Sequence, residues 1–288
     1  MNASNPVAHH EVEIHGTVVD MLVGGAASPR PMVAFAHPTD RFDESSVDLL
    51  AGLVGAQTAC IHAHGGEDPV SSLEAMVEHI EGARRALGLG PWIFWGMSGG
   101  GWLAQIYARR HPEALVGVVV ESACLSFRAR LADPACVLSP FFPAWRDGLL
   151  AASLLPESGH EADPESETCW ESVDGVGQVF RLREGPALLV SPAPVTAAMQ
   201  AAMPMLMRFD SRAWISSIEV PMLVLAGQED PIVPLHRARA LHEAVPASSF
   251  AVVADGGHVP SATGHPEVAR AFESFVNRLV EESRTQRP

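Results

Sequence analysis

The chain alternates between short runs of apolar residues and longer stretches in which apolar residues recur with helical spacing. The apolar runs, which predict strands, are 31–37, 58–64, 91–97, 115–122, 221–227 and 248–255. The stretches with helical spacing are 45–55, 71–87, 99–111, 235–245 and 266–282. Uniformly apolar strands are typical of a parallel sheet whose two faces are covered by crossover helices. The pattern therefore predicts an α/β fold: a mostly parallel central sheet with helices on both faces.

Local signals predict where several elements begin. Residues 12–25 alternate around Gly16, which predicts two early strands joined by a turn. Ser71 or Ser72 opens the helix at 71–87, and Glu74 lies at capping-box distance from Ser71.

The regular order of elements stops after residue 122 and resumes at 221. Residues 123–212 contain proline-rich turns and helical fragments. We therefore predict a core formed by 1–122 and 213–288, with a helical cap inserted at 123–212. Within the cap, 156–175 holds seven acidic residues and no Lys or Arg. A solvated surface explains this charge better than an amine-binding site does.

Composition narrows the class of protein. The 288 residues are 47% hydrophobic and 18% charged, as in soluble globular proteins. A net charge of −15 disfavours nucleic-acid partners, which need clustered basic residues. No apolar run approaches the ~18 residues of a membrane helix, and the first residues lack the pattern of a secretory signal. We expect a cytoplasmic protein acting on a small molecule.

The cysteines and histidines give little sign of a metal. The four cysteines form no CxxC pair, which favours reduced thiols over a zinc or redox site. His62 and His64 share one face of a predicted strand, where they could bind a metal. A structural role or contact with the mouth of the site is the favoured interpretation, so we predict no metal.

One serine stands among glycines at the end of an apolar strand. Residues 96–100, GMSGG, match the pattern G-x-S-x-G between a predicted strand and a predicted helix. This is the context of a nucleophile elbow, a strained turn that projects the serine hydroxyl above the sheet. The helix N-terminus beside it favours developing negative charge. We therefore predict that Ser98 is a nucleophile.

A serine hydroxyl needs a base, and the base needs an orienting acid. Asp230 in GQEDPIVP and His258 in DGGHVP each follow a predicted strand. The order serine, acid, histidine is the one that accompanies G-x-S-x-G, and parallel strands end at one edge of a sheet. We predict Asp230 as the acid and His258 as the base; Glu229 and Asp255 are weaker alternatives for the acid.

With these motifs the chain resembles the α/β-hydrolase family. The resemblance is carried by GMSGGGWLAQIYARRHPEALVGVVV, VPMLVLAGQEDPIVP and VVADGGHVP, and it covers most of the chain outside 123–212. It implies a nucleophile at Ser98, an acid at Asp230 and a base at His258. It also implies that the inserted segment is the lid or cap of this family.

The resemblance further implies an oxyanion hole made by the backbone amides of Gly99 and Thr39. The family usually carries His-Gly at this loop, whereas this chain has His37-Pro38. Proline has no N–H, but the expected donor is the next residue, so the hole can form with an altered loop. HAHGGEDP at 62–69 replaces the family's Arg-Gly-x-Gly loop and lacks its arginine.

The substrate contacts follow from less specific signals. The candidates are His37, Met97, Trp102, Trp145, Met203 and Met207. Flexible methionines adapt to apolar ligands such as an acyl chain, although packing of a cap helix explains them at least as well. Large aromatic residues are more often part of a core than of a site.

The predicted activity is hydrolysis of a carboxylic ester or lactone of a small, partly apolar substrate through an acyl-enzyme on Ser98, with no cofactor. Serine at this position disfavours dehalogenase and epoxide hydrolase chemistry, which the family carries out through an aspartyl ester. Amide or peptide cleavage, acyl transfer, C–C bond hydrolysis and lyase chemistry on the same residues stay open. So does a non-catalytic binding protein with this fold. The sequence also leaves open whether the chain forms a homodimer.

Overall fold

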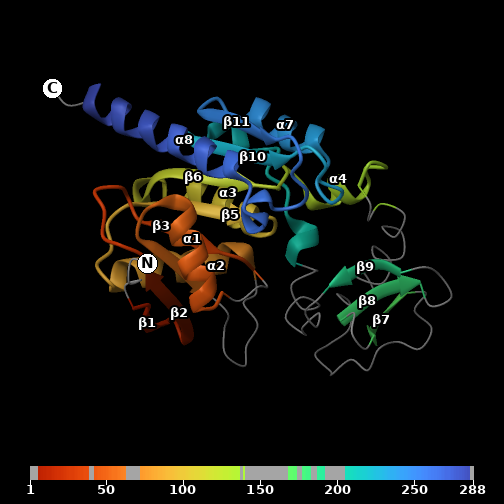
Figure 1. Ribbon diagram of the computed structural model, residues 1–288, viewed down its shortest axis with the longest axis horizontal. Helices are drawn as coiled ribbons and strands as arrows, with labels where there is room; N and C mark the ends of the chain where they lie inside the picture. The colour runs from red at the N-terminus through yellow and green to blue at the C-terminus, as the bar shows by residue number, and fades with distance from the viewer. Residues whose placement is uncertain are drawn as a thin grey trace.

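The computed structural model describes residues 6–38, 42–62, 72–136, 139, 168–173, 177–182, 187–191 and 205–285. Its main sheet has eight strands in the order β1-β2-β4-β3-β5-β6-β10-β11 (Figure 1). The strands are β1 (Ala8–Ile14), β2 (Thr17–Gly24), β3 (Val33–Ala36), β4 (Thr58–His62), β5 (Trp92–Met97), β6 (Leu115–Glu121), β10 (Met222–Gly227) and β11 (Ser248–Val253). From β4 to β11 all neighbours are parallel, while β2 runs antiparallel to both β1 and β4.

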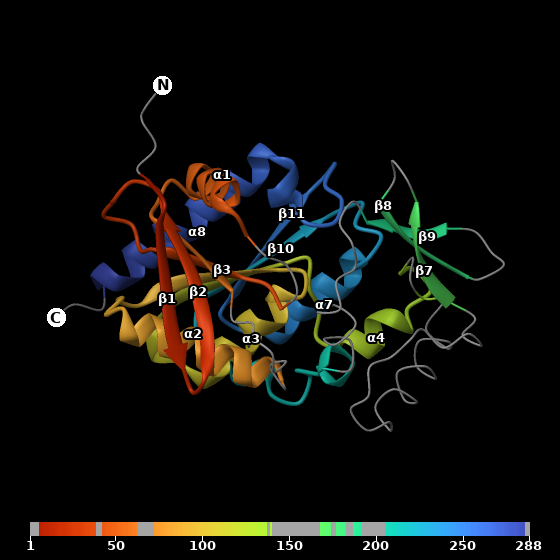
Figure 2. The same ribbon diagram turned by 90° about the horizontal axis from the view of Figure 1, so that it is seen from below.

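Helices cover both faces of this sheet, as predicted (Figure 2). Helices α2 (Leu73–Ala86), α3 (Gly100–Arg110) and α7 (Leu235–Ala244) pack on one face. Helices α1 (Glu44–Val54) and α8 (Pro266–Thr285) pack on the other. The shorter helices with described bounds include α4 (Phe127–Leu131) and the 3₁₀ turns η1 (Pro112–Ala114), η3 (Ile215–Ser217) and η4 (Pro260–Thr263).

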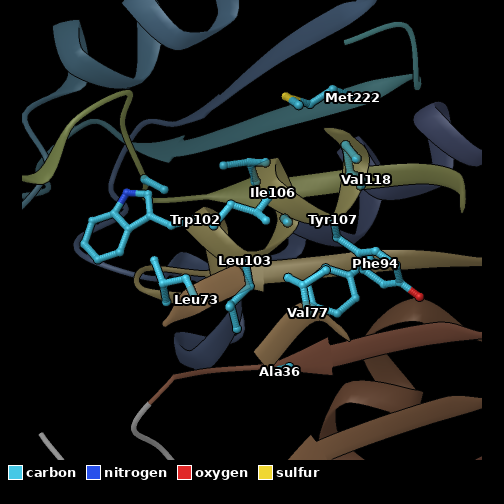
Figure 3. Close-up of a cluster of buried hydrophobic side chains, with 14 of the residues drawn as sticks. Ala36, Leu73, Val77, Phe94, Trp102, Leu103, Ile106, Tyr107, Val118 and Met222 are labelled. Atoms are coloured by element: carbon cyan, nitrogen blue, oxygen red, sulfur yellow. The ribbon is translucent and has the colours of Figure 1, made fainter. Parts of the chain in front are cut away.

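The larger hydrophobic core lies under α3. Figure 3 shows Leu103, Ile106 and Tyr107 of this helix among side chains of α2 and of strands β5, β6 and β10. Tyr107 packs edge-on against Phe94 of β5, with ring centroids 5.1 Å apart. All of these side chains are at most 3% exposed. The helix that follows Ser98 is therefore held on the sheet by close packing.

Buried aromatic rings also fix the opposite face. Trp95 of β5 lies 5.4 Å from the ring of Phe35 and 5.2 Å from the ring of Phe272 on α8. Because side chains alternate along a strand, β5 sends Phe94 to one core and Trp95 to the other. The strand that leads into Ser98 is thus packed on both faces.

Local capping agrees with the sequence signals, with one change. The turn at Gly16 is present, and the left-handed residues His15 and Gly16 join β1 to β2. Ser72 is the cap of α2, because its side chain accepts a hydrogen bond from the Ala75 amide at 3.1 Å. The capping box expected from Ser71 therefore does not start this helix; Ser71 itself lies outside the described residues.

The inserted segment contains strands that the sequence does not predict. Strands β7 (Thr168–Val173), β8 (Gly177–Leu182) and β9 (Ala187–Ser191) form an antiparallel sheet. Their sequences TCWESV, GQVFRL and ALLVS are rich in β-branched, aromatic and leucine residues. The helical cap expected here is therefore partly strand in the described residues. The boundaries at 123 and 212 stay a prediction.

Among the described residues, no helix combines the length and the apolarity needed to cross a bilayer.

Two glycines in helices offer a matched test of this packing. Gly52 is exposed on α1, and a Cβ there would meet nothing within 4 Å. We expect Gly52→Ala to raise the free energy of unfolding by about 0.5–1 kcal/mol through helix propensity. A Cβ at Gly82 of α2 would lie 2.8 Å from Ile14, so Gly82→Ala should give no such gain. Urea unfolding followed by circular dichroism measures both; equal effects would contradict the packing described here.

Candidate active site

The backbone turns sharply between β5 and α3. Ser98 has φ of +50°, the left-handed region that a residue with a side chain rarely adopts. Its amide donates to the carbonyl oxygen of Glu121 on β6 at 2.8 Å, which continues the sheet as far as the turn. This is the geometry predicted for an elbow that lifts the Ser98 hydroxyl above the sheet.

Two of the glycines are required by close backbone contacts. A Cβ at Gly96 would lie 2.0 Å from the carbonyl oxygen of Gly100, and one at Gly100 would lie 2.3 Å from the carbonyl oxygen of Ala36. No side chain fits at these distances, so the turn can close only with glycine at both positions. The motif G-x-S-x-G is thus explained by sterics around the serine.

The structure brings the three predicted side chains into one hydrogen-bonded row. His258 Nε2 lies 2.9 Å from Ser98 Oγ. His258 Nδ1 lies 2.9 Å from Asp230 Oδ2 and 3.1 Å from Oδ1. The three residues follow β5, β10 and β11, which are parallel and end at the same edge of the sheet. Glu229 and Asp255, the alternatives for the acid, are exposed on the same loops.

The environment of Asp230 keeps it ionised. Its side chain is fully buried, which by itself raises the pKa of a carboxyl group. The bond to His258 and those from the Val233 and Ile232 amides, at 2.9 and 2.8 Å, outweigh burial and lower the pKa of Asp230. An ionised Asp230 accepts hydrogen bonds only, so His258 Nδ1 carries a proton and Nε2 is free to accept one from Ser98.

The loop that carries His258 is also held in an unusual conformation. Val259 has φ of +56°, which is strained for a β-branched residue. Its amide donates to Ser122 Oγ at 3.2 Å, and Ser122 itself has φ of +50°. Sequence reasoning missed Ser122, because a serine after an apolar strand carries no distinctive signal.

The predicted oxyanion site is described on one side only. Gly99 is the N-cap of α3, where the first amides of a helix have no partner within the helix. A Cβ at Gly99 would lie 2.9 Å from His37 Nε2 and from Pro38 Cγ, so this loop lies directly against the elbow. Thr39 is outside the described residues. The pair of amides stays a prediction.

The structure places the predicted substrate-binding residues in different environments. His37 and Met97 are half-buried next to the elbow. Trp102 is only 2% exposed, lies 5.1 Å from the ring of Phe127 and belongs to the core, so its predicted contact with substrate is wrong. Met207 is partly buried against the same core, as the packing interpretation holds. Trp145 and Met203 lie outside the described residues.

His62 and three of the cysteines are buried in the fold. His62 is 6% exposed, and its Nε2 lies 2.8 Å from the carbonyl oxygen of Phe42. Cys60, Cys124 and Cys136 are buried free thiols. His64 lies outside the described residues.

A group of potential metal ligands occurs away from this site. Ligand atoms of Glu81, His111 and Glu113 lie within 4.8 Å of one another. Arg84 and Arg85 contact Glu81 at 2.7 and 2.5 Å, however. Two guanidinium groups on this carboxylate oppose a further cation, so the group is better explained as an ion-pair network.

The chain belongs to the α/β-hydrolase family. It matches the family described as "alpha/beta hydrolase fold" over residues 22–264, which include the whole hydrogen-bonded row.

Curated relatives share the family and differ in activity. A "Probable proline iminopeptidase" of Leptolyngbya boryana is 26% identical over 233 residues, which are 71% of this chain and 70% of that protein. A pimeloyl-(acyl-carrier protein) methyl ester esterase of Citrobacter koseri is 26% identical over 218 residues, 72% of this chain and 77% of that protein.

Solved structures share the fold. An alpha/beta fold family hydrolase from Bacillus anthracis has a TM-score of 0.66 at 14% identity, covering 96% of this chain and 100% of that chain. A thermophilic esterase from Thermogutta terrifontis has a TM-score of 0.61 at 21% identity, covering 96% and 99%.

The lowered pKa of Asp230 predicts a pH-dependent effect on stability. Folding favours the ionised form of Asp230, so this group adds to the free energy of unfolding. The added stability is fully present above the pKa of Asp in the unfolded chain, about 3.9, and is lost as the pH falls through the lower pKa of the folded chain. We expect Asp230→Asn to lower the free energy of unfolding by about 1–3 kcal/mol at pH 7, and by less at pH 3. Urea unfolding at several pH values measures this difference. The exposed Asp255→Asn is the control, and a loss that does not depend on pH would contradict the assignment.

Proposed function

We propose that this protein is a serine hydrolase that cleaves a carboxylic ester or lactone of a small, partly apolar substrate. The observation that carries the proposal is the row in which Ser98 Oγ, His258 and Asp230 are joined by contacts of 2.9 Å. An alcohol, an imidazole and a buried carboxylate in this order are the parts needed for nucleophilic acyl transfer.

In the first half of the reaction, Ser98 Oγ attacks the carbonyl carbon while its proton passes to His258 Nε2. The negative charge moves to the carbonyl oxygen, and Asp230 stabilises the imidazolium that forms. When the tetrahedral intermediate collapses, His258 gives the proton to the leaving alkoxide. The products of this half are an alcohol and an ester on Ser98. In a lactone, the alcohol stays attached to the acyl group.

The oxyanion of the intermediate needs donors close to Ser98. The Gly99 amide at the N-terminus of α3 is one such donor, and the Thr39 amide is the second by resemblance to the family. A donor that is in place before the reaction costs no reorganisation as the charge forms, and loss of one costs on the order of 3–4 kcal/mol.

Water completes the reaction by the same route in reverse. His258 Nε2 removes a proton from water, the hydroxide oxygen bonds to the acyl carbon, and the proton returns to Ser98 Oγ as the ester bond breaks. Every proton in the cycle moves between substrate, water, Ser98 and His258. The mechanism therefore needs no cofactor.

The assignment to esters is supported by the relatives and the site together. The curated relative of Citrobacter koseri and the structural neighbour from Thermogutta terrifontis carry names that state esterase activity. Of the side chains beside the elbow in the described residues, Met97 is apolar, which suits an uncharged acyl group.

A second candidate is cleavage of an amide, such as removal of an amino-terminal residue. It is favoured by the relative named as an iminopeptidase. The same row of residues serves both reactions, because they share the tetrahedral intermediate and differ in the leaving group.

Replacement of Ser98 tests the nucleophile. We expect Ser98→Ala to lower kcat by at least about a thousandfold, because the attacking oxygen is lost while the scaffold remains. Covalent labelling by a fluorophosphonate probe, read by mass spectrometry, should also disappear. Ser216→Ala, which removes an exposed hydroxyl, is the matched control and should leave both unchanged. Hydrolysis at the original rate by Ser98→Ala would refute the proposal.

A substrate panel separates the two candidates. We expect kcat/KM for p-nitrophenyl esters of two to eight carbons, or for simple lactones, to exceed that for prolyl and other aminoacyl p-nitroanilides by about a hundredfold or more. An excess in favour of the anilides would assign the site to amide cleavage. The Ser98→Ala protein provides the background rate for each compound.

A further inference from the structure

A carboxyl group that the mechanism does not use lies directly behind the row. Glu121 is the last residue of β6 and is fully buried, at 0% exposure. Burial raises the pKa of such a group, so an acidic side chain here is costly unless donors surround it. In the sequence, this position is marked by one charged residue that ends the apolar run LVGVVVE.

Three donors surround this carboxyl group. Glu121 Oε1 accepts from the Ser261 amide at 2.8 Å. Oε2 accepts from the Ser261 hydroxyl at 2.7 Å and from the indole N–H of Trp95 at 2.9 Å. Glu121 is the acceptor in each contact, and these hydrogen bonds act to lower its pKa against the larger effect of burial.

The donors come from two different elements of the fold. Trp95 belongs to β5, three residues before Ser98, and stacks in the core. Ser261 belongs to η4, three residues after His258, so two of the bonds hold the loop of the imidazole. The backbone of Glu121 adds a third link, because its carbonyl oxygen accepts from the Ser98 amide at 2.8 Å.

We propose that Glu121 is a positioning residue, which holds the loop of His258 in register with the elbow of Ser98 through its two bonds to Ser261. This inference rests on the proposed function. Glu121 is one of several fixed points of this loop among the described residues: the Val259 amide also donates to Ser122 Oγ, the Glu229 amide donates to the carbonyl oxygen of Gly256, and the Ser261 hydroxyl lies 3.4 Å from Met97 Sδ. A rigid link is needed, because an imidazole displaced by about 1 Å lowers the rate up to about a hundredfold.

Three single variants separate positioning from general support of the core. In Glu121→Gln the side-chain NH₂ must face an N–H donor, either that of Trp95 or that of Ser261, so the three donors no longer share one acceptor. Ser261→Ala removes the hydroxyl bond to Glu121, together with the 3.4 Å contact to Met97 Sδ, and keeps the amide bond. Trp95→Phe removes a donor to the same carboxylate without a contact to the His258 loop, and is the matched control.

The readout is the rate constant for fluorophosphonate labelling of Ser98, together with kcat and KM for one ester. It is measured at a temperature where circular dichroism shows all variants folded. We expect Glu121→Gln to slow labelling and kcat by about 10- to 100-fold and Ser261→Ala by about 3- to 10-fold, with KM changed less than about twofold. Trp95→Phe should lower the melting temperature and change both rates by less than about twofold.

The double variant adds a test that a purely structural role would not satisfy. If both side chains act through the same contact, Glu121→Gln with Ser261→Ala should label no more than about twofold slower than Glu121→Gln alone. Should Glu121→Gln fail to fold, Ser261→Ala against Trp95→Phe decides the matter.

The outcomes are distinguishable. Labelling of Glu121→Gln or Ser261→Ala within about twofold of the unchanged chain overturns the role of Glu121 alone, and so does a Trp95→Phe protein as slow as the other variants. Absence of Ser98 labelling in the unchanged chain overturns the proposed function, and this inference with it.

Discussion

The site depends on the close packing of backbone atoms around the elbow, at the carboxyl edge of the sheet. Ser98 is held at φ of +50° only because Gly96 and Gly100 leave no Cβ in the way. The strain is balanced by β5, which is packed on both faces and bonded to β6 as far as the Ser98 amide. A rigid sheet therefore carries a turn that would not be stable by itself.

Two buried carboxyl groups, Asp230 and Glu121, lie next to the elbow and the loop of His258. Asp230 is buried, yet two amides and an imidazole keep it ionised, and this fixes which nitrogen of His258 holds the proton. Glu121 is a second buried acid with the opposite balance, since burial raises its pKa in spite of three donors. Both carboxyl groups contact the loop of His258, but the pKa of Asp230 is lowered whereas that of Glu121 is raised.

The sequence predicted most elements, because a parallel sheet covered on both faces leaves a strong apolar pattern. It missed β7, β8 and β9, whose short runs lie among prolines and acidic residues. It also assigned Trp102 to the site, whereas this indole packs on Phe127 and donates to the carbonyl oxygen of Cys124. Large aromatic side chains look the same in sequence whether they line a core or a pocket.

The sequence by itself determined the elbow, since only glycines around a serine between strand and helix permit that turn, and it placed Asp230 and His258 after strands of one sheet. Only the tertiary structure decided that Ser98, 160 residues before His258, lies 2.9 Å from it. The role of Glu121 has the same origin. Its partner Ser261 is 140 residues away, and no local pattern records a contact that exists only after β6 and the histidine loop have packed together.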